Sequence, residues 1–379
     1  MKRVYWRPAG VSRRAMVLIT AVAIGVLLAV ELLPVERKQP WYEEKLQAAH
    51  LARQAMGVIK MEKARRGIQA DPEADPNDTG MVGVALSAVT SNTGYVSAKH
   101  TAINPNFAAM FVHLLKRAGV NKGDLVAVGV SGSFPSLNIG AFAAIQTLEL
   151  EPMVIASASA SQWGANHESF MWIDMERVLS DQKIFMFRSI AASRGGIDDR
   201  GLGMSERGRA LIDQAIARNN LRRIEPESLA DSVEQRMNIF HENRKPVRAY
   251  INIGGGAASV GTHVGKKLFR PGLNLRPPRR RGVADSVMMR FAEHDVPVIH
   301  IFRIAELAER YGFPLEPTGI PRPGEGEVFF KLEHNRWLAA GGILLILAVM
   351  LGFIRMDVGM RILKAARRKG EADQPQPMV

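Results

Sequence analysis

Three serine- or glycine-rich segments each follow a short apolar run, and these are the positions at which the chain could bind a ligand. They span residues 128–138, 157–166 and 251–261. Small residues let a ligand approach the backbone, and the free N–H groups that begin a helix favour an anion. A tight turn without function is the alternative for each segment. With a guanidinium from the segment after residue 188, the candidate ligand-binding residues are Ser131, Gly132, Ser133, Ser159, Ser161, Arg194, Gly254, Gly255, Gly256 and Ser259.

The first segment also approaches a catalytic motif. Residues 129–133 are close to the G-x-S-x-G nucleophile elbow, although Ser133 stands where the last glycine belongs. An acid and a histidine follow in the chain order of an α/β-hydrolase triad. Most chains of this length contain serine, aspartate and histidine in that order, so binding without catalysis stays open. The candidate catalytic residues are Ser131, Asp198, Asp199 and His263.

The chain offers little that would hold a metal or a cofactor. It has no cysteine, and its nine histidines show no zinc spacing, so we expect no metal site. Asp198 and Asp199 could hold a divalent ion, but a solvated turn is the simpler interpretation. Residues 254–256 and 261–267 lack the full glycine spacing of the dinucleotide-binding and phosphate-binding motifs. We therefore expect no cofactor.

The elements that must position these segments alternate between strand and helix patterns. Apolar runs without polar alternation are typical of parallel strands that are buried on both faces. The pattern predicts an α/β fold with a parallel, doubly wound sheet, in which ligands bind at the carboxyl ends of the strands. The predicted strands are 81–89, 125–130, 153–158, 184–190, 248–253 and 297–301. The predicted helices are 41–66, 106–118, 136–150, 168–179, 206–218, 228–243, 286–294 and 304–311.

Two long apolar segments, 15–33 and 337–354, lie near the two ends of the chain. At ~1.5 Å per helical residue, each can cross a hydrocarbon layer about 30 Å thick. Basic residues flank each segment on its terminal side, so we expect both termini in the cytoplasm and the main domain outside. A cleaved signal peptide is the alternative for 15–33, but no small-x-small site ends that segment. Gly341 and Gly342 would allow a partner helix to approach the second segment closely.

These features divide the chain into seven parts. We expect a cytoplasmic basic tail, a transmembrane helix, a juxtamembrane helix with a linker, an α/β domain, a proline-rich linker, a second transmembrane helix and a second basic tail. Their bounds are 1–14, 15–33, 34–80, 81–312, 313–336, 337–354 and 355–379.

The net charge of +13 does not indicate nucleic-acid binding. Residues 1–14 carry five basic and no acidic groups, and residues 355–379 carry six basic and three acidic groups, so the tails hold most of the excess. One further basic cluster lies in a proline-interrupted loop at 266–281. A solvated surface is the simpler interpretation, but such a cluster can attract a polyanion or lipid head groups. The candidate polyanion contacts are Lys266, Lys267, Arg270, Arg279, Arg280 and Arg281.

Four segments carry a resemblance to a known family, namely 129–138, 162–168, 194–203 and 252–256. With these segments and the two apolar ends, the chain resembles the poly-γ-glutamate system protein family over essentially its whole length. That family is a membrane component of bacterial poly-γ-glutamate synthesis. The resemblance implies a pathway, the production of capsular or released polyglutamate, and implies no reaction.

Three functions follow as expectations. The first is a membrane-anchored accessory protein of the bacterial cytoplasmic membrane, which binds poly-γ-glutamate outside the cell or scaffolds the synthase. The second is a hydrolase or transferase that acts on γ-glutamyl chains through Ser131. The third is an extracytoplasmic domain that binds a small anion. The expected partners are the lipid bilayer, the synthase components and the polymer, and no nucleic acid.

Overall fold

A computed structural model describes residues 13–254, 256–261, 268–276 and 285–372. The chain forms two compact units, one made of Met1–Arg37 with Lys331–Val379 and the other of Lys38–Phe330. Some of the residues singled out above lie outside the described ranges: Gly255, His263, Lys266, Lys267, Arg279, Arg280 and Arg281.

The Lys38–Phe330 unit is built around a seven-stranded sheet in the order β11-β12-β10-β3-β4-β8-β9. The strand pairs between β12 and β9 are all parallel, whereas β11 runs antiparallel to β12 at one edge. The predicted parallel α/β sheet is therefore confirmed, with one antiparallel edge strand that was not predicted. The strands are β3 (Leu125–Ser131), β4 (Glu151–Ser157), β8 (Ala191–Ser193), β9 (Arg222–Ile224), β10 (Val247–Ile253), β11 (Gly272–Asn274) and β12 (Val298–Ile301).

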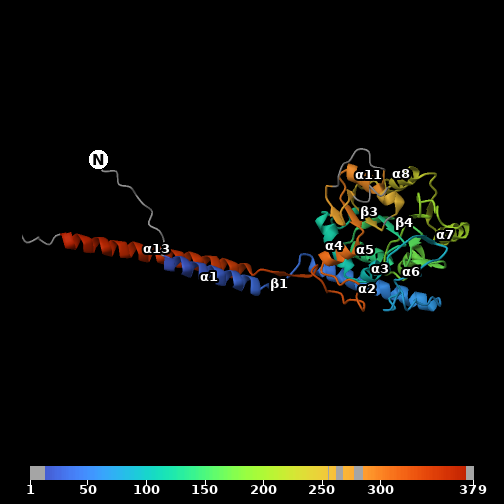
Figure 1. Cartoon of the computed structure of the whole chain (residues 1–379). Helices are drawn as coiled ribbons and strands as arrows, with labels where there is room; N and C mark the ends of the chain where they lie inside the picture. The colour runs from blue at the N-terminus through green and yellow to red at the C-terminus, as the bar shows by residue number, and fades with distance from the viewer. Residues whose placement is uncertain (1–12, 255, 262–267, 277–284, 373–379) are drawn as a thin grey trace, which may run out of the picture. The chain divides into compact units, whose positions relative to one another are not determined.

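Helices cover both faces of this sheet. Successive side chains of each strand point to opposite sides, and in β3 they are apolar on both, so each face packs against helices. Val126 and Val128 of β3 join a core with α2, α4 and α5, and Leu125 and Ala127 join a second core with α8 and α11. Figure 1 shows α8 and α11 on one side of β3 and β4, with α5 and α2 on the other. The helices are α2 (Tyr42–Arg65), α3 (Val96–Ala102), α4 (Phe107–Arg117), α5 (Pro135–Thr147), α6 (Trp172–Asp181), α7 (Glu206–Arg218), α8 (Leu229–Phe240), α9 (Ala257–Val260), α11 (Val287–Glu293) and α12 (Ile304–Arg310).

Two predicted strands are wrong. Residues 81–89 form no strand. The backbone N–H and carbonyl of Val84 form hydrogen bonds with the side chain of Asn166, and not with a neighbouring strand. Residues 184–190 also form no strand, because Ile184 bonds back to Leu179 at the end of α6 and its carbonyl accepts from a Gln146 side chain. The strand of this region, β8, begins one residue later. Short pairs were not predicted either: β2 (Thr90–Asn92) with β5 (Ala160–Ser161), and β6 (Asn166–His167) with β7 (Phe170–Met171).

The helix α2 belongs to the core of this unit. Ala48, Ala52, Ala55 and Ile59 are fully buried in the same core as α4 and α5. Within the segment 34–80, all residues after Arg37 belong to the larger unit.

The smaller unit holds α1 (Arg13–Leu32), β1 (Val35–Lys38), β13 (Phe330–Glu333) and α13 (Arg336–Ala372), whose strands pair at the boundary with the larger unit. The helices α1 and α13 lie side by side and antiparallel (Figure 1). A Cβ atom at Gly342 would overlap Val26, so this glycine permits the close approach of the two helices. Within the described residues, one helix is long and apolar enough to cross a membrane, at Arg336–Arg355, and the apolar stretch Met16–Leu32 is shorter.

Candidate functional site

The order of the strands creates one position where two neighbouring strand ends diverge. From β3 the chain proceeds outward through β4, β8 and β9, and it then returns to place β10 on the other side of β3. The connections after β3 and after β10 therefore leave the sheet in different directions. Such a switch point, at the carboxyl ends of the strands, is where open α/β sheets bind their ligands.

A crevice of about 400 Å³ lies at this edge of the sheet. Serine residues from β2 (Thr90–Asn92) and from the ends of β3 and β4 with the connections that follow them meet in it, and we call it the serine crevice. It brings together the predicted segments after β3, β4 and β10, together with the segment after β8. Its lining residues are Ser91, Asn92, Ser131, Ser133, Ser157, Ser159, Gly196, Ile197, Asp198, Leu229, Gly256, Ala257 and Gly261.

Ser131 and Gly254 meet at the point where β3 and β10 diverge. A Cβ atom on Gly254 would lie 2.6 Å from Ser131 Oγ, and the φ of Gly254 is +96°. Glycine is required here for both reasons, because other residues strain at this φ and have no space for a side chain. The sequence indicated a glycine loop at this strand end, and the structure shows that the contact with Ser131 and the positive φ require glycine at residue 254.

The hydroxyl groups of the crevice are held by backbone N–H groups. Ser131 Oγ accepts from the Ser133 N–H at 3.4 Å, and Ser133 Oγ accepts from the Ser161 N–H at 3.1 Å. The Gly132 N–H is used by the carbonyls of Ser157 and Ser159, so it does not face a ligand. Because these hydroxyls accept from the backbone, their own hydrogens can be donated to an acceptor in the crevice.

A buried charged network supports the crevice from beneath. Asp199 and Arg236 form an ion pair at 2.8 Å, and both side chains are almost fully buried. Asp199 also accepts from Ser193 at 2.7 Å and from Ser232 at 2.6 Å. The Arg236 guanidinium reaches Ser157 Oγ at 3.2 Å and thereby fixes a lining residue of the crevice.

This network contains one candidate catalytic acid. Asp199 is held by Arg236 and by the hydroxyls of Ser157, Ser193 and Ser232. Asp198 does line the crevice, and its φ of +55° places it in the left-handed region. Among the described residues, no hydrogen bond links Ser131 Oγ to a histidine or a carboxylate, and His263 lies outside them.

Lys99 of α3 was not predicted to belong to this site. Its Nζ donates to the carbonyl of Ser133 and, at 2.9 Å, to Ser161 Oγ, with the Phe134 ring 3.9 Å away. Burial lowers the pKa of Lys99 to about 7. Lys99 fixes the backbone turn after β3, and a lone lysine in the sequence gave no sign of this contact.

Beside the crevice lies a smaller pocket of about 360 Å³ with four arginines, which we call the arginine pocket. Arg194 binds Asp213 with two hydrogen bonds of 2.7 and 2.5 Å, and Arg223 binds the same carboxylate at 2.9 Å. Arg209 donates to the Met204 carbonyl at 2.7 Å. The side chain of Arg200 is exposed and has no hydrogen bond or ion pair with any residue that the structure describes. Arg200 can therefore bind an anion without losing a partner.

The remaining predicted residues that the structure describes do not line the serine crevice. Arg194 lines the arginine pocket instead of the crevice. Ser161 is buried against Lys99, and Ser259 Oγ accepts from the Tyr250 hydroxyl at 3.1 Å. Arg270, among the predicted polyanion contacts, is exposed.

Comparison of the chain with protein-family models, with curated proteins and with solved structures finds no match. The geometry of the serine crevice and the arginine pocket, with the resemblance described above, is therefore the basis for a functional proposal.

Proposed function

We propose that this chain is a membrane-anchored accessory protein whose Lys38–Phe330 unit lies outside the bacterial cytoplasmic membrane and binds a polymer of carboxylates. The proposed polymer is poly-γ-glutamate, on the basis of the family resemblance. The proposed partners in the membrane are the components of its synthase.

The observation that carries the proposal is the serine crevice at the switch point. Its hydroxyls can donate hydrogen bonds, which suits the carboxylate or the amide carbonyl of a γ-glutamyl unit. Asp198 in the same lining can accept a hydrogen bond from an amide N–H of the chain. The polar groups of a γ-glutamyl unit thus find matching groups in the crevice.

Binding is favoured over hydrolysis by the surroundings of Ser131. A serine nucleophile needs a base within hydrogen-bond reach. Among the described residues, Ser131 Oγ accepts from the backbone and packs against Gly254, and Asp199 is neutralised by Arg236.

The arginine pocket supports a chain ligand instead of a single small anion. It adjoins the crevice across the segment 194–202, which contributes residues to both. A polymer with one carboxylate per unit can place one group in the crevice and a neighbouring group beside Arg200. Each contact then adds to the affinity of the other.

Membrane anchoring by both terminal helices is part of the proposal. The apolar side chains of α1 and α13 are largely exposed, as expected of helices that face lipid, and include Leu18, Ile24, Leu27, Leu344 and Leu351. The antiparallel pairing of α1 with α13 suits a chain whose termini are both cytoplasmic. The basic residues beyond each apolar segment agree with the same orientation.

The experiment that tests the proposal uses the full chain in lipid nanodiscs with fluorescent poly-γ-glutamate. We expect saturable binding that is weakened by salt, and an unchanged polymer length after prolonged incubation. Absence of binding would contradict the proposal. Shortening of the polymer that is abolished by Ser131→Ala would replace it with the hydrolase alternative.

A further inference from the structure

A separate pocket of about 720 Å³ lies between the C-terminal part of α2 and the segment that follows it. Its lining includes Lys60, Lys63, Ile68, Val82, Val84 and His167, and it shares no residue with the serine crevice or the arginine pocket. Its volume falls within the usual range of small-molecule sites. The function proposed above makes no use of it.

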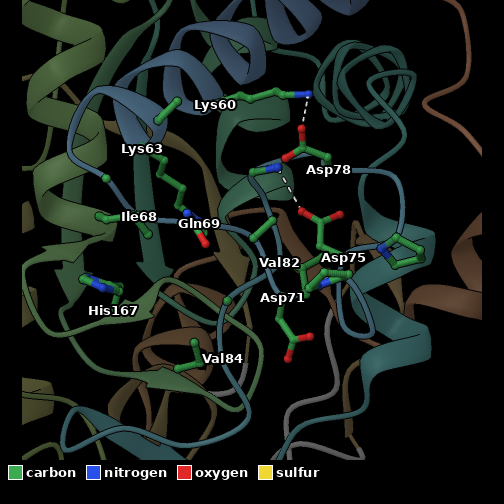
Figure 2. Close-up of a pocket in the computed structure, with 17 residues that line it drawn as sticks. Lys60, Lys63, Ile68, Gln69, Asp71, Asp75, Asp78, Val82, Val84 and His167 are labelled. Atoms are coloured by element: carbon green, nitrogen blue, oxygen red, sulfur yellow. Dashed lines mark hydrogen bonds and ion pairs between the residues drawn. The ribbon is translucent and has the colours of Figure 1, made fainter.

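Lys63 is the unusual residue of this pocket. Its side chain is 8% exposed, and its Nζ makes no hydrogen bond or ion pair with any residue in the described part of the chain. Figure 2 shows it extending from α2 toward Gln69, whereas Lys60 reaches away to Asp78. Burial lowers the pKa of Lys63 to about 8, although the nearby Asp75 carboxylate opposes this shift, so the amine is still mostly protonated at neutral pH. A buried, unpaired ammonium is costly, and a bound anion would relieve that cost.

The other charged groups of the pocket are already engaged. Lys60 pairs with Asp78 at 2.9 Å. Asp75 accepts from the Thr79 hydroxyl at 3.0 Å and from the Gly80 N–H at 2.9 Å (Figure 2). Asp71 accepts from the N–H groups of the turn that follows it. Lys63 is therefore the ammonium group of this lining that has no hydrogen bond or ion pair within the described residues.

His167 adds a second donor. Its Nδ1 accepts from the Ser169 N–H at 3.4 Å, which leaves the proton on Nε2. Burial and the nearby Lys63 charge lower its pKa, so the ring is neutral at pH 7. Because His167 is neutral, the charge of a bound anion would pair with Lys63.

The rest of the lining restricts the class of ligand. Ile68, Val82 and Val84 offer apolar surface to the body of a molecule. The carboxylates of Asp71, Asp75 and Asp78 repel an anion in proportion to its charge, and so disfavour a multiply charged anion more than a monocarboxylate. We infer that this pocket binds a small organic carboxylate with an apolar body, whose carboxylate pairs with Lys63.

The probe for this inference is hexanoate, added to the full chain in lipid nanodiscs and followed by saturation-transfer NMR, with empty nanodiscs subtracted. Hexanamide has a similar shape without the charge, and inorganic phosphate has charge without the apolar body. We expect hexanoate to bind at least about tenfold more tightly than hexanamide or phosphate. A tenfold difference in Kd is about what one hydrogen bond to a charged group contributes. Equal binding of hexanoate and hexanamide by the parent protein would overturn the inference.

Two matched variants locate the site. Lys63→Met keeps the length of the side chain and should abolish hexanoate binding. Lys122→Met removes an exposed, already paired lysine that does not line this pocket, and should leave binding within about twofold of the parent. Hexanoate binding that survives Lys63→Met, in a protein with an unchanged melting temperature, would also overturn the inference. Poly-γ-glutamate binding should be the same in both variants, so a failure of this inference is distinguishable from a failure of the proposed function.

Discussion

Gly254 and Ser131 lie so close that a single methyl group on Gly254 would come within 2.6 Å of the serine hydroxyl. This contact joins the ends of β10 and β3, the two strands that diverge at the switch point. The close approach of these two strand ends therefore depends on the absence of a side chain at Gly254.

The first prediction tests that contact. Gly254→Ala should lower the free energy of unfolding by roughly 1–3 kcal/mol, because the left-handed backbone and the clash with Ser131 both cost energy. Gly119→Ala is the matched control, since Gly119 has a φ of +83° and nothing within 4 Å of the added methyl. Chemical unfolding of the two variants separates strain from clash. Equal destabilisation by both would show that Ser131 does not restrict Gly254.

The second prediction concerns Arg200. Arg200→Glu should weaken poly-γ-glutamate binding by roughly three- to tenfold at low salt and less at high salt, because exposed charges are screened. Arg222→Glu makes the same change of charge at the first residue of β9, whose side chain lines neither pocket, and should change binding little. Fluorescence anisotropy at two salt concentrations measures both. An effect of Arg222→Glu as large as that of Arg200→Glu would indicate nonspecific attraction.

The third prediction is a dependence of stability on pH that comes from Glu176. This carboxyl is almost fully buried and accepts from the Ser189 hydroxyl at 3.0 Å, and burial raises its pKa from 4.5 to about 8. Between these two values the folded state keeps a proton that the unfolded state releases. The contribution of Glu176 to the free energy of unfolding is therefore complete below pH 4.5. It is lost as the pH rises to about 8, at about 1 kcal/mol per pH unit.

Glu176→Gln keeps the neutral form at every pH and should remove this loss. The melting temperature of the parent, relative to the variant, should fall between pH 5 and pH 8. The buried lysines Lys45, Lys63 and Lys99 have lowered pKa values and act in the opposite direction, but they are common to both proteins. A constant difference across this range would mean that Glu176 is ionised in the folded state.

The fourth prediction is the orientation in the membrane. The chain has no cysteine, so a single introduced cysteine reports the side on which it lies. Tyr95→Cys replaces a side chain that is 80% exposed and should react with an impermeant thiol reagent in intact cells. Gln374→Cys should react after the membrane is permeabilised. The reverse pattern would place the Lys38–Phe330 unit in the cytoplasm and remove the basis for an external polymer ligand.

The strand ends could be predicted from the sequence because runs such as 125–130 are apolar on both faces and end in small residues. Parallel strands bring such ends to one edge, so Ser131, Ser133 and Gly256 line the same crevice. The apolar run at 184–190 misled the prediction, because its residues pack around Gln146 and the end of α6 instead of extending a ladder.

The contacts made by long side chains could not be predicted. Arg236 reaches Asp199 from a helix 37 residues further along the chain, and Lys99 reaches Ser161 over 62 residues. Nothing in the local pattern of either residue indicates its partner. The arginine pocket and the unpaired Lys63 likewise depend on how distant segments fold together.

The most direct measurement is the affinity of fluorescent poly-γ-glutamate for the full chain in nanodiscs when the serine crevice is filled. Gly256 lines the crevice and has an ordinary φ of −53°, so Gly256→Phe adds a ring there without straining the backbone. Gly319→Phe is the control, because nothing lies within 4 Å of a Cβ atom added at Gly319, which does not line the crevice. We expect Gly256→Phe to raise the Kd at least about tenfold, with Gly319→Phe equal to the parent. An unchanged Kd for a folded Gly256→Phe protein would show that the polymer does not bind in the serine crevice.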